Sequence, residues 1–128
     1  MKKILSTLVA TTLLAGSLSA QAITVGFSQV GSESGWRTSF SESVKEEAEK
    51  RGITLKFSDA QQKQENQIKA VRSFIAQRVD AIVIAPVVET GWQPVLMEAK
   101  RARIPVVIVD RNVSVSYTHL TLPTNREV

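Results

Sequence analysis

The feature that most constrains this chain is a strand-like segment that recurs every 25 to 30 residues. Short runs rich in β-branched residues begin near residues 23, 53, 80 and 105, and a helix-forming amphipathic stretch fills each gap. Such alternation predicts right-handed crossovers and a parallel sheet with helices on both faces. The unbroken apolar runs Ala81–Ala85 and Val106–Val109 agree, because strands buried on both faces lose their apolar–polar alternation. The predicted fold class is α/β.

The spacing also predicts where each element begins and ends. Strands are expected at residues 23–27, 53–57, 80–85 and 106–109, and helices at 36–51, about 61–77 and about 91–102. Gly52 lies just beyond the first helix, a position that glycine favours. Ligands of parallel α/β sheets bind outside the carboxyl ends of the strands. This rule selects the loops Ser28–Arg37, Pro86–Gly91 and Asp110–Asn112 as candidate sites.

The first residues have the three parts of a secretory signal. Met1–Lys3 is positively charged, Ile4–Leu18 is apolar and uncharged, and small residues occupy Ala20 and Ala22. A membrane-spanning helix is the alternative, but it needs about 20 apolar residues. Ile4–Leu18 offers fifteen, and serine, threonine and glycine dilute them. We therefore expect a signal peptide at residues 1–22, cleavage after Ala22 and a periplasmic location.

Composition excludes several function classes. The chain has no cysteine and one histidine, His119, so disulfides, zinc–thiolate sites and cysteine nucleophiles are excluded. Neither a metal nor a cofactor is expected. The net charge is +4, but Lys2 and Lys3 supply half of it, and residues 23–113 are nearly balanced. A nucleic-acid partner is not expected, because it would require a basic stripe or patch.

Polar and aromatic residues at the predicted strand ends suit a sugar. A sugar offers hydroxyl groups that both donate and accept, and an apolar C–H face that packs on aromatic rings. Asp110 and Arg111 follow the fourth strand, while Glu33, Trp36 and Arg37 lie where the first helix begins. An ordinary exposed loop pair is the alternative for Asp110–Arg111, and a core or helix-start aromatic is the alternative for Trp36. Trp92 is interpreted as a packing residue.

Several longer segments carry a resemblance to a known family. They are TVGFSQVGSESGWR (Thr24–Arg37), EAEKRGITLK (Glu47–Lys56), QQKQENQIKAVRSF (Gln61–Phe74) and IAPVVETGWQPVL (Ile84–Leu96). Two shorter motifs, DAIxIxP (Asp80–Pro86) and IPVVxxDR (Ile104–Arg111), would alone indicate only the fold superfamily. Through these segments residues 23–111 resemble the N-terminal part of periplasmic sugar-binding proteins of ABC transporters, of the ribose-binding type.

The resemblance implies a type I periplasmic binding protein fold, with residues 23–113 as an incomplete N-terminal lobe. It implies a substrate-binding component of a carbohydrate ABC importer, without enzyme activity, that binds a galactofuranose-like monosaccharide between two lobes. The implied ligand contacts are Glu33, Ser34, Gly35, Trp36, Arg37, Asp110 and Arg111. The implied partners are the monosaccharide and a membrane permease, and the full-length protein is expected to be a monomer.

Two positions depart from the family pattern. Relatives commonly carry glycine where this chain has Arg78 and Arg103, each just after a predicted helix. If the backbone is left-handed there, a residue other than glycine costs about 1 kcal/mol. The departures therefore concern stability more than binding.

Three other functions fit the fold class. The effector domain of a sugar-responsive repressor shares the fold, but it would need an N-terminal helix-turn-helix where this chain has an export signal. A secreted α/β enzyme would need a nucleophile–base pair or a phosphate loop, and the candidate loops contain neither. A chemoreceptor-linked binding protein cannot be separated from a transport protein by sequence.

The resemblance ends near Asn112. The run VSYTHLTLPT (Val115–Thr124) continues no pattern of the family and is similar to a translated sequencing adapter. We therefore expect residues 114–128 to be a non-native tail, with a divergent natural tail as the alternative. Tyr117 and His119 are then given no function. Resequencing tests this, since a native reading frame through codons 114–128 would refute it.

Overall fold

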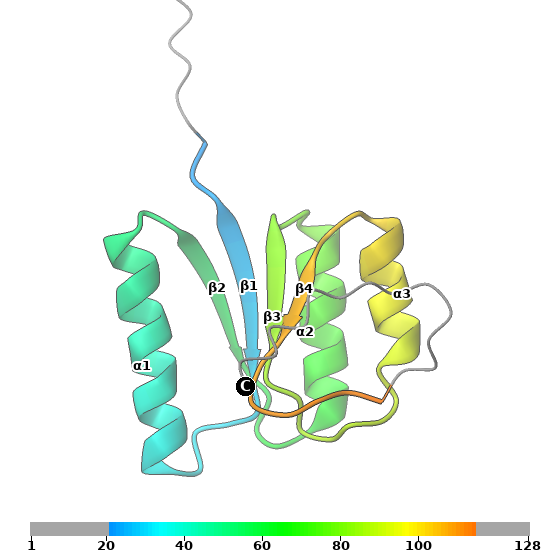
Figure 1. The fold of residues 1–128 in the computed structure, drawn as a ribbon, viewed down its shortest axis with the longest axis horizontal. Helices are drawn as coiled ribbons and strands as arrows, with labels where there is room; N and C mark the ends of the chain where they lie inside the picture. The colour runs from blue at the N-terminus through cyan, green and yellow to red at the C-terminus, as the bar shows by residue number, and fades with distance from the viewer. Residues whose placement is uncertain (1–20, 115–128) are drawn as a thin grey trace, which may run out of the picture.

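A computed structural model describes residues 21–114 and contains the alternating strands and helices that the spacing predicts (Figure 1). In chain order they are β1 (Thr24–Gln29), α1 (Gly35–Lys50), β2 (Thr54–Asp59), α2 (Gln64–Ala76), β3 (Ala81–Ile84), α3 (Gln93–Arg101) and β4 (Val106–Ile108). None of these helices combines the length and hydrophobicity that a bilayer span requires. The signal-peptide and tail predictions fall almost wholly outside the described residues.

The four strands form one parallel sheet in the order β2-β1-β3-β4. Phe27 of β1 lies beside Phe57 of β2 and Val83 of β3, and Val83 lies beside Val107 of β4. β2 is therefore added on one side of β1, and β3 and then β4 are added on the other side. All four carboxyl ends reach the lower edge of the sheet in Figure 1, which brings the loops after β1, β3 and β4 together. The α/β prediction is confirmed.

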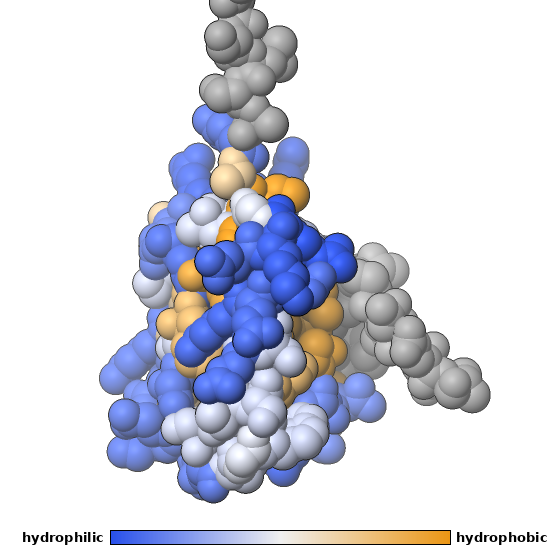
Figure 2. All heavy atoms as spheres, turned by 90° about the vertical axis from the view of Figure 1, so that its left-hand side faces the viewer, coloured by the Kyte–Doolittle hydropathy of each residue, from blue (hydrophilic) through white to orange (hydrophobic). Residues whose placement is uncertain are grey.

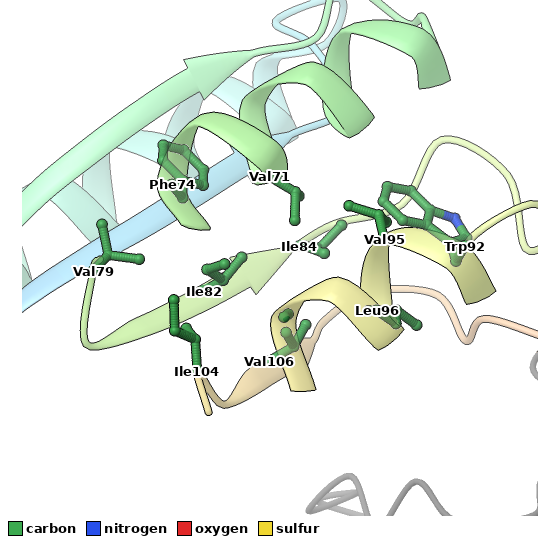
Figure 3. Packing of buried hydrophobic residues seen from close by; sticks show 11 residues of the cluster. Val71, Phe74, Val79, Ile82, Ile84, Trp92, Val95, Leu96, Ile104 and Val106 are labelled. Carbon is green, nitrogen blue, oxygen red and sulfur yellow. The ribbon is translucent and has the colours of Figure 1, made fainter. Parts of the chain in front are cut away.

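The main core lies between the sheet and helices α2 and α3 (Figure 3). Ile82 and Ile84 of β3 meet Phe74 of α2 and Leu96 of α3 there, and all are buried. Trp92 is fully buried in the same cluster, as predicted. The close approach of α2 to β1 requires Gly26, because a Cβ at this position would lie 2.5 Å from the ring of Phe74.

The opposite face of the sheet is covered unevenly. Phe27 packs against Phe40 of α1, with ring centroids 5.9 Å apart, and against Phe57 of β2 at 5.6 Å. Val83 and Val107 alternate with the core residues of their strands, so they point to this face, and both are half-buried. Figure 2 shows a mostly hydrophilic outer surface on α1, with hydrophobic atoms visible on both sides of it.

Element boundaries differ from the predictions by up to three residues, and three of these differences have a clear physical cause. β1 continues through Ser28 and Gln29, which were predicted to belong to the following loop. Gln29 tolerates full burial because its Nε2 donates to Ser41 Oγ at 3.2 Å and its Oε1 accepts from Val30 N at 3.0 Å. α2 begins at Gln64 rather than Gln61, since Gln61 and Gln62 have φ values of 52° and 61°. α3 begins at Gln93, after Gly91 turns with a φ of 82°.

All three helices end in the same backbone motif. The third residue past each helix donates its N–H back to the third-last helical carbonyl. These bonds join Ile53 to Ala48 (2.8 Å), Val79 to Phe74 (3.3 Å) and Ile104 to Ala99 (3.0 Å). The motif needs a left-handed residue just before the donor, and the φ values there are 66° at Gly52, 54° at Arg78 and 59° at Arg103. Both arginines are therefore left-handed, which is the condition under which a residue other than glycine costs stability.

Candidate functional site

The loop after β1 leads into α1 at the carboxyl edge of the sheet, and Ser34 shapes this entry. Ser34 has extended backbone and forms the N-cap of α1, with its Oγ accepting from Arg37 N at 3.3 Å. Its carbonyl accepts from Thr38 N at 3.1 Å. Gly35 is the first helical residue, and a Cβ there would meet nothing within 4 Å. These two residues set the direction in which the following side chains leave the helix.

Arg37 is the centre of the site. It is 8% exposed, and a guanidinium so deeply buried requires charged or polar partners. Its Nε pairs with the carboxylate of Glu33, and its Nη1 donates to Asp110 Oδ2 at 3.3 Å. The side chains of Glu33 and Asp110 keep 32% and 25% of their surface exposed. The cluster therefore ties the loop after β1 to the end of β4 and leaves carboxylate oxygens open to solvent.

Asp110 has an unusual backbone conformation. Its φ is 71°, and Arg111 N donates to Val109 O at 2.9 Å, which closes a three-residue γ-turn around it. A γ-turn with positive φ at its centre is rare and strained for a residue with a side chain. Strain of this kind is concentrated at functional sites, where the surrounding structure maintains it. At Asp110 it accompanies a carboxylate directed at Arg37.

Trp36 forms an aromatic surface at the border of the cluster. It is 59% exposed, and its ring stacks on Phe40 with centroids 5.5 Å apart and an interplanar angle of 11°. The guanidinium carbon of Arg37 lies 5.7 Å from the centroid of the Trp36 ring. Phe40 and Arg37 thus hold the indole in place while much of it stays open to solvent. An exposed, supported aromatic beside polar groups suits a ligand with an apolar face and hydroxyls.

Arg111 points to a different part of the edge. Its Nη1 donates to the carbonyl of Val87, in the loop after β3, at 3.2 Å. Of the predicted site residues, the structure therefore brings Glu33, Arg37 and Asp110 into direct contact and places Trp36 beside them. Ser34 and Gly35 form the helix start, and Arg111 joins the neighbouring loop.

Two features beside the cluster were not predicted. Ser41 is buried beneath Arg37 and donates its Oγ to Arg37 O at 2.9 Å, while it accepts from Gln29. An open cavity of about 300 Å³ is lined in part by Glu33 and Asp59. Asp59 ends β2, so the strand-end rule could have found it. The pairing of Gln29 with Ser41 has no such signal, because buried and exposed polar residues look alike in a sequence.

The side chains at this edge are of the kinds that can bind hydroxyl groups. Carboxylates accept hydrogen bonds from sugar hydroxyls, and guanidinium groups donate pairs of parallel ones. Among residues 21–114, the side chains include no cluster of three acidic or histidine groups that could hold a metal ion.

Comparisons with known proteins identify the family of this chain. Residues 25–128 match the family described as periplasmic binding protein domain. The chain is 67% identical over 105 residues to the galactofuranose-binding protein YtfQ of Escherichia coli K12, a match that covers 82% of this chain and 33% of YtfQ. The chain therefore spans about a third of the length of this curated relative.

Two solved structures of sugar-bound proteins are also similar to this chain. One is the binding protein of the arabinose ABC transporter of Shewanella sp. ANA-3, bound to α- and β-L-arabinofuranose. It is 84% identical with a TM-score of 0.73, over 73% of this chain and 31% of that one. The other is a Mycobacterium smegmatis protein in complex with β-D-fucofuranose, 57% identical with a TM-score of 0.74. That match covers 76% of this chain and 32% of the other.

Proposed function

Because the chain belongs to the periplasmic binding protein domain family, we propose that it supplies the first lobe of a binding protein that captures a furanose sugar for an ABC importer. The relatives are transport binding proteins rather than enzymes. Galactofuranose, arabinofuranose and fucofuranose differ in stereochemistry and exocyclic groups but share the five-membered ring. The ring form is therefore the ligand property that these relatives have in common.

The observation that carries the proposal is the ion-pair cluster beside an exposed tryptophan at the carboxyl edge of the sheet. In this proposal the carboxylate oxygens of Asp110 and Glu33 accept hydrogen bonds from ring hydroxyls, and the ion pairs with Arg37 hold both carboxylates in position. Trp36 packs against the C–H face of the sugar. Arg111 donates to a further hydroxyl, and Ser34 with Gly35 sets the start of α1.

We further propose that the sugar lies between this lobe and a second one, and that binding favours the closed arrangement. A ligand shifts such an equilibrium only by its additional contacts with the closed form. The permease partner and the periplasmic location belong to the same proposal, together with a signal peptide at residues 1–22 that is cleaved after Ala22.

The test uses a joined protein, in which residues 23–113 precede the part of YtfQ beyond the matched segment. Isothermal titration should give heat with L-arabinose and D-galactose, which form furanoses in water, and with a methyl furanoside. A methyl pyranoside, locked in the six-membered ring, should give none. Equal binding of the pyranoside would refute the furanose assignment. If the joined protein melts cooperatively and intact YtfQ binds, the absence of binding to every sugar would refute the function.

A further inference from the structure

The loop between β3 and α3 (residues 85–92, here the clamp loop) is held by five hydrogen bonds that its backbone carbonyls accept. Its carbonyl oxygens accept from Gln67 Nε2 at Ala85, from Arg111 Nη1 at Val87, from Trp92 Nε1 at Val88, from Ser114 N at Glu89 and from Gln64 Nε2 at Thr90. The clamp loop is therefore fixed from several sides at the edge that carries the candidate site.

Gln67 of α2 makes the most buried of these contacts. Its side chain is 0% exposed, although α2 is otherwise amphipathic. Its Nε2 donates to Ala85 O at 2.7 Å, and its Oε1 accepts from Val87 N at 2.8 Å. A side-chain amide is both donor and acceptor, so it can satisfy a carbonyl and an N–H two residues apart. The two bonds fix the backbone of Val87 relative to the sheet.

Val87 connects this buried amide to the candidate site. Its N–H bonds to Gln67, and its carbonyl accepts from Arg111 Nη1 at 3.2 Å. Arg111 is exposed, and among residues 21–114 its guanidinium is held by this hydrogen bond. A long, flexible side chain in water loses its defined position when such a bond is lost.

We propose that Gln67 is a positioning residue for sugar binding: through Val87 it fixes the carbonyl that holds the Arg111 guanidinium at the carboxyl edge of the sheet. The inference rests on the proposed function, since it assumes that Arg111 contacts the sugar. It assigns a role in binding to a residue that is buried and distant in sequence from the residues proposed to contact the sugar. A purely structural role would affect folding stability without depending on Arg111.

A double-mutant cycle in the joined protein separates the two roles. Gln67→Met keeps the length of the side chain and removes both bonds, and we expect it to weaken furanose affinity about tenfold. In an Arg111→Ala background the same change should alter affinity by less than about twofold, because the group that it positions is gone. Gln64→Met is the matched control: it frees Thr90 O of the same loop, does not touch Val87 and should leave affinity unchanged.

Several outcomes would overturn the inference. Equal losses of affinity from Gln67→Met in both backgrounds would mean that Gln67 acts without Arg111. Unchanged affinity in Gln67→Met, while Arg111→Ala weakens binding, would refute the positioning role and leave the proposed function standing. If Gln67→Met does not fold, Gln67→Glu serves in the same cycle, since it retains the acceptor for Val87 N and loses the donor to Ala85 O. Hydrogen exchange at the Val87 amide should accelerate in Gln67→Met and not in Gln64→Met.

Discussion

The two ends of the sheet both contain left-handed residues other than glycine, but in different settings. At the amino end, Arg78 and Arg103 follow α2 and α3 with positive φ, where Gly52 follows α1. Within residues 21–114 neither arginine side chain makes a hydrogen bond or an ion pair, and both line an open cavity of about 620 Å³. At the carboxyl end, Asp110 has the same sign of φ, and its carboxylate pairs with buried Arg37.

This difference separates a left-handed residue whose side chain is part of the candidate site from left-handed residues whose side chains are not. A left-handed residue with a Cβ costs about 1 kcal/mol. At Asp110 this cost accompanies a carboxylate that pairs with Arg37, while Arg111 bonds to the clamp loop. At Arg78 and Arg103 the backbone motif would form equally well with glycine, as it does at Gly52. We therefore assign binding to the carboxyl end and stability to the amino end.

The largest expected effect, on both sugar affinity and folding, is that of producing the 128-residue chain without a second lobe. The 128-residue chain, made as written, should bind no sugar tightly and should aggregate or melt without cooperativity. It spans about a third of its curated relative, Val83 and Val107 are incompletely covered, and β4 leaves one open strand edge. Size-exclusion chromatography, circular dichroism and sugar titration check this. A monodisperse, cooperatively melting monomer with micromolar affinity would show that one lobe suffices.

The next effect concerns Asp110. In the joined protein, Asp110→Ala should weaken furanose binding by roughly 10- to 100-fold, because it removes an acceptor and leaves Arg37 with one carboxylate. Titration of the sugar into the variant measures the change, and a thermal melt confirms that it folds. Unchanged affinity would mean that the ion-pair cluster is not part of the site.

Trp36→Ala should have a smaller effect on affinity, about tenfold, because it removes packing against the sugar and no charged partner. Stability should change little, since the indole is 59% exposed. Val88→Ala provides the control, as Val88 is another exposed apolar residue at the same edge, 41% exposed. Equal affinities in the two variants would place the aromatic surface outside the site.

At the amino end, Arg78→Gly and Arg103→Gly should each stabilise the fold by about 1 kcal/mol, and the two gains should add. Gly52→Ala should have the opposite sign, because it introduces a Cβ at a φ of 66°. Urea unfolding of the joined protein measures all three. A loss of stability in either arginine variant would mean that the side chain makes a contact worth more than the relief of strain.

The smallest effect lies between the two ends, at the exposed pair of Arg72 on α2 and Glu98 on α3. The hydrogen bond from Arg72, and secondarily its charge, lowers the pKa of Glu98 below the usual 4.5. A carboxylate with a lowered folded-state pKa stabilises the fold above its unfolded pKa, and this contribution is lost as pH falls through the lowered value. Glu98→Gln should remove only this small acid-dependent part of the unfolding free energy. Identical pH profiles in both proteins would show that the pair contributes nothing.

Sequence patterns predicted the fold better than the site. The recurrence of strands determined the parallel sheet, because burial on both faces leaves a strong apolar signal. The strand order could not be predicted, since spacing does not say on which side of β1 each new strand is added. Gln29 and Gln67 were missed for one reason: their burial depends on partners distant in the chain, Ser41 and the clamp loop. The γ-turn at Asp110 likewise could not be predicted, because aspartate at this position is compatible with several turn conformations.

The most direct test of the division between the two ends is one titration series on the joined protein with L-arabinose. It compares the unchanged protein, the Arg78→Gly/Arg103→Gly variant and Asp110→Asn, in which asparagine tolerates the left-handed backbone but carries no charge. The dissociation constants of the first two should agree within about twofold, and that of Asp110→Asn should rise at least about tenfold, since a charge-assisted hydrogen bond is lost. Unchanged affinity in Asp110→Asn, or weakened affinity in the double glycine variant, would contradict the assignment of binding to the carboxyl end.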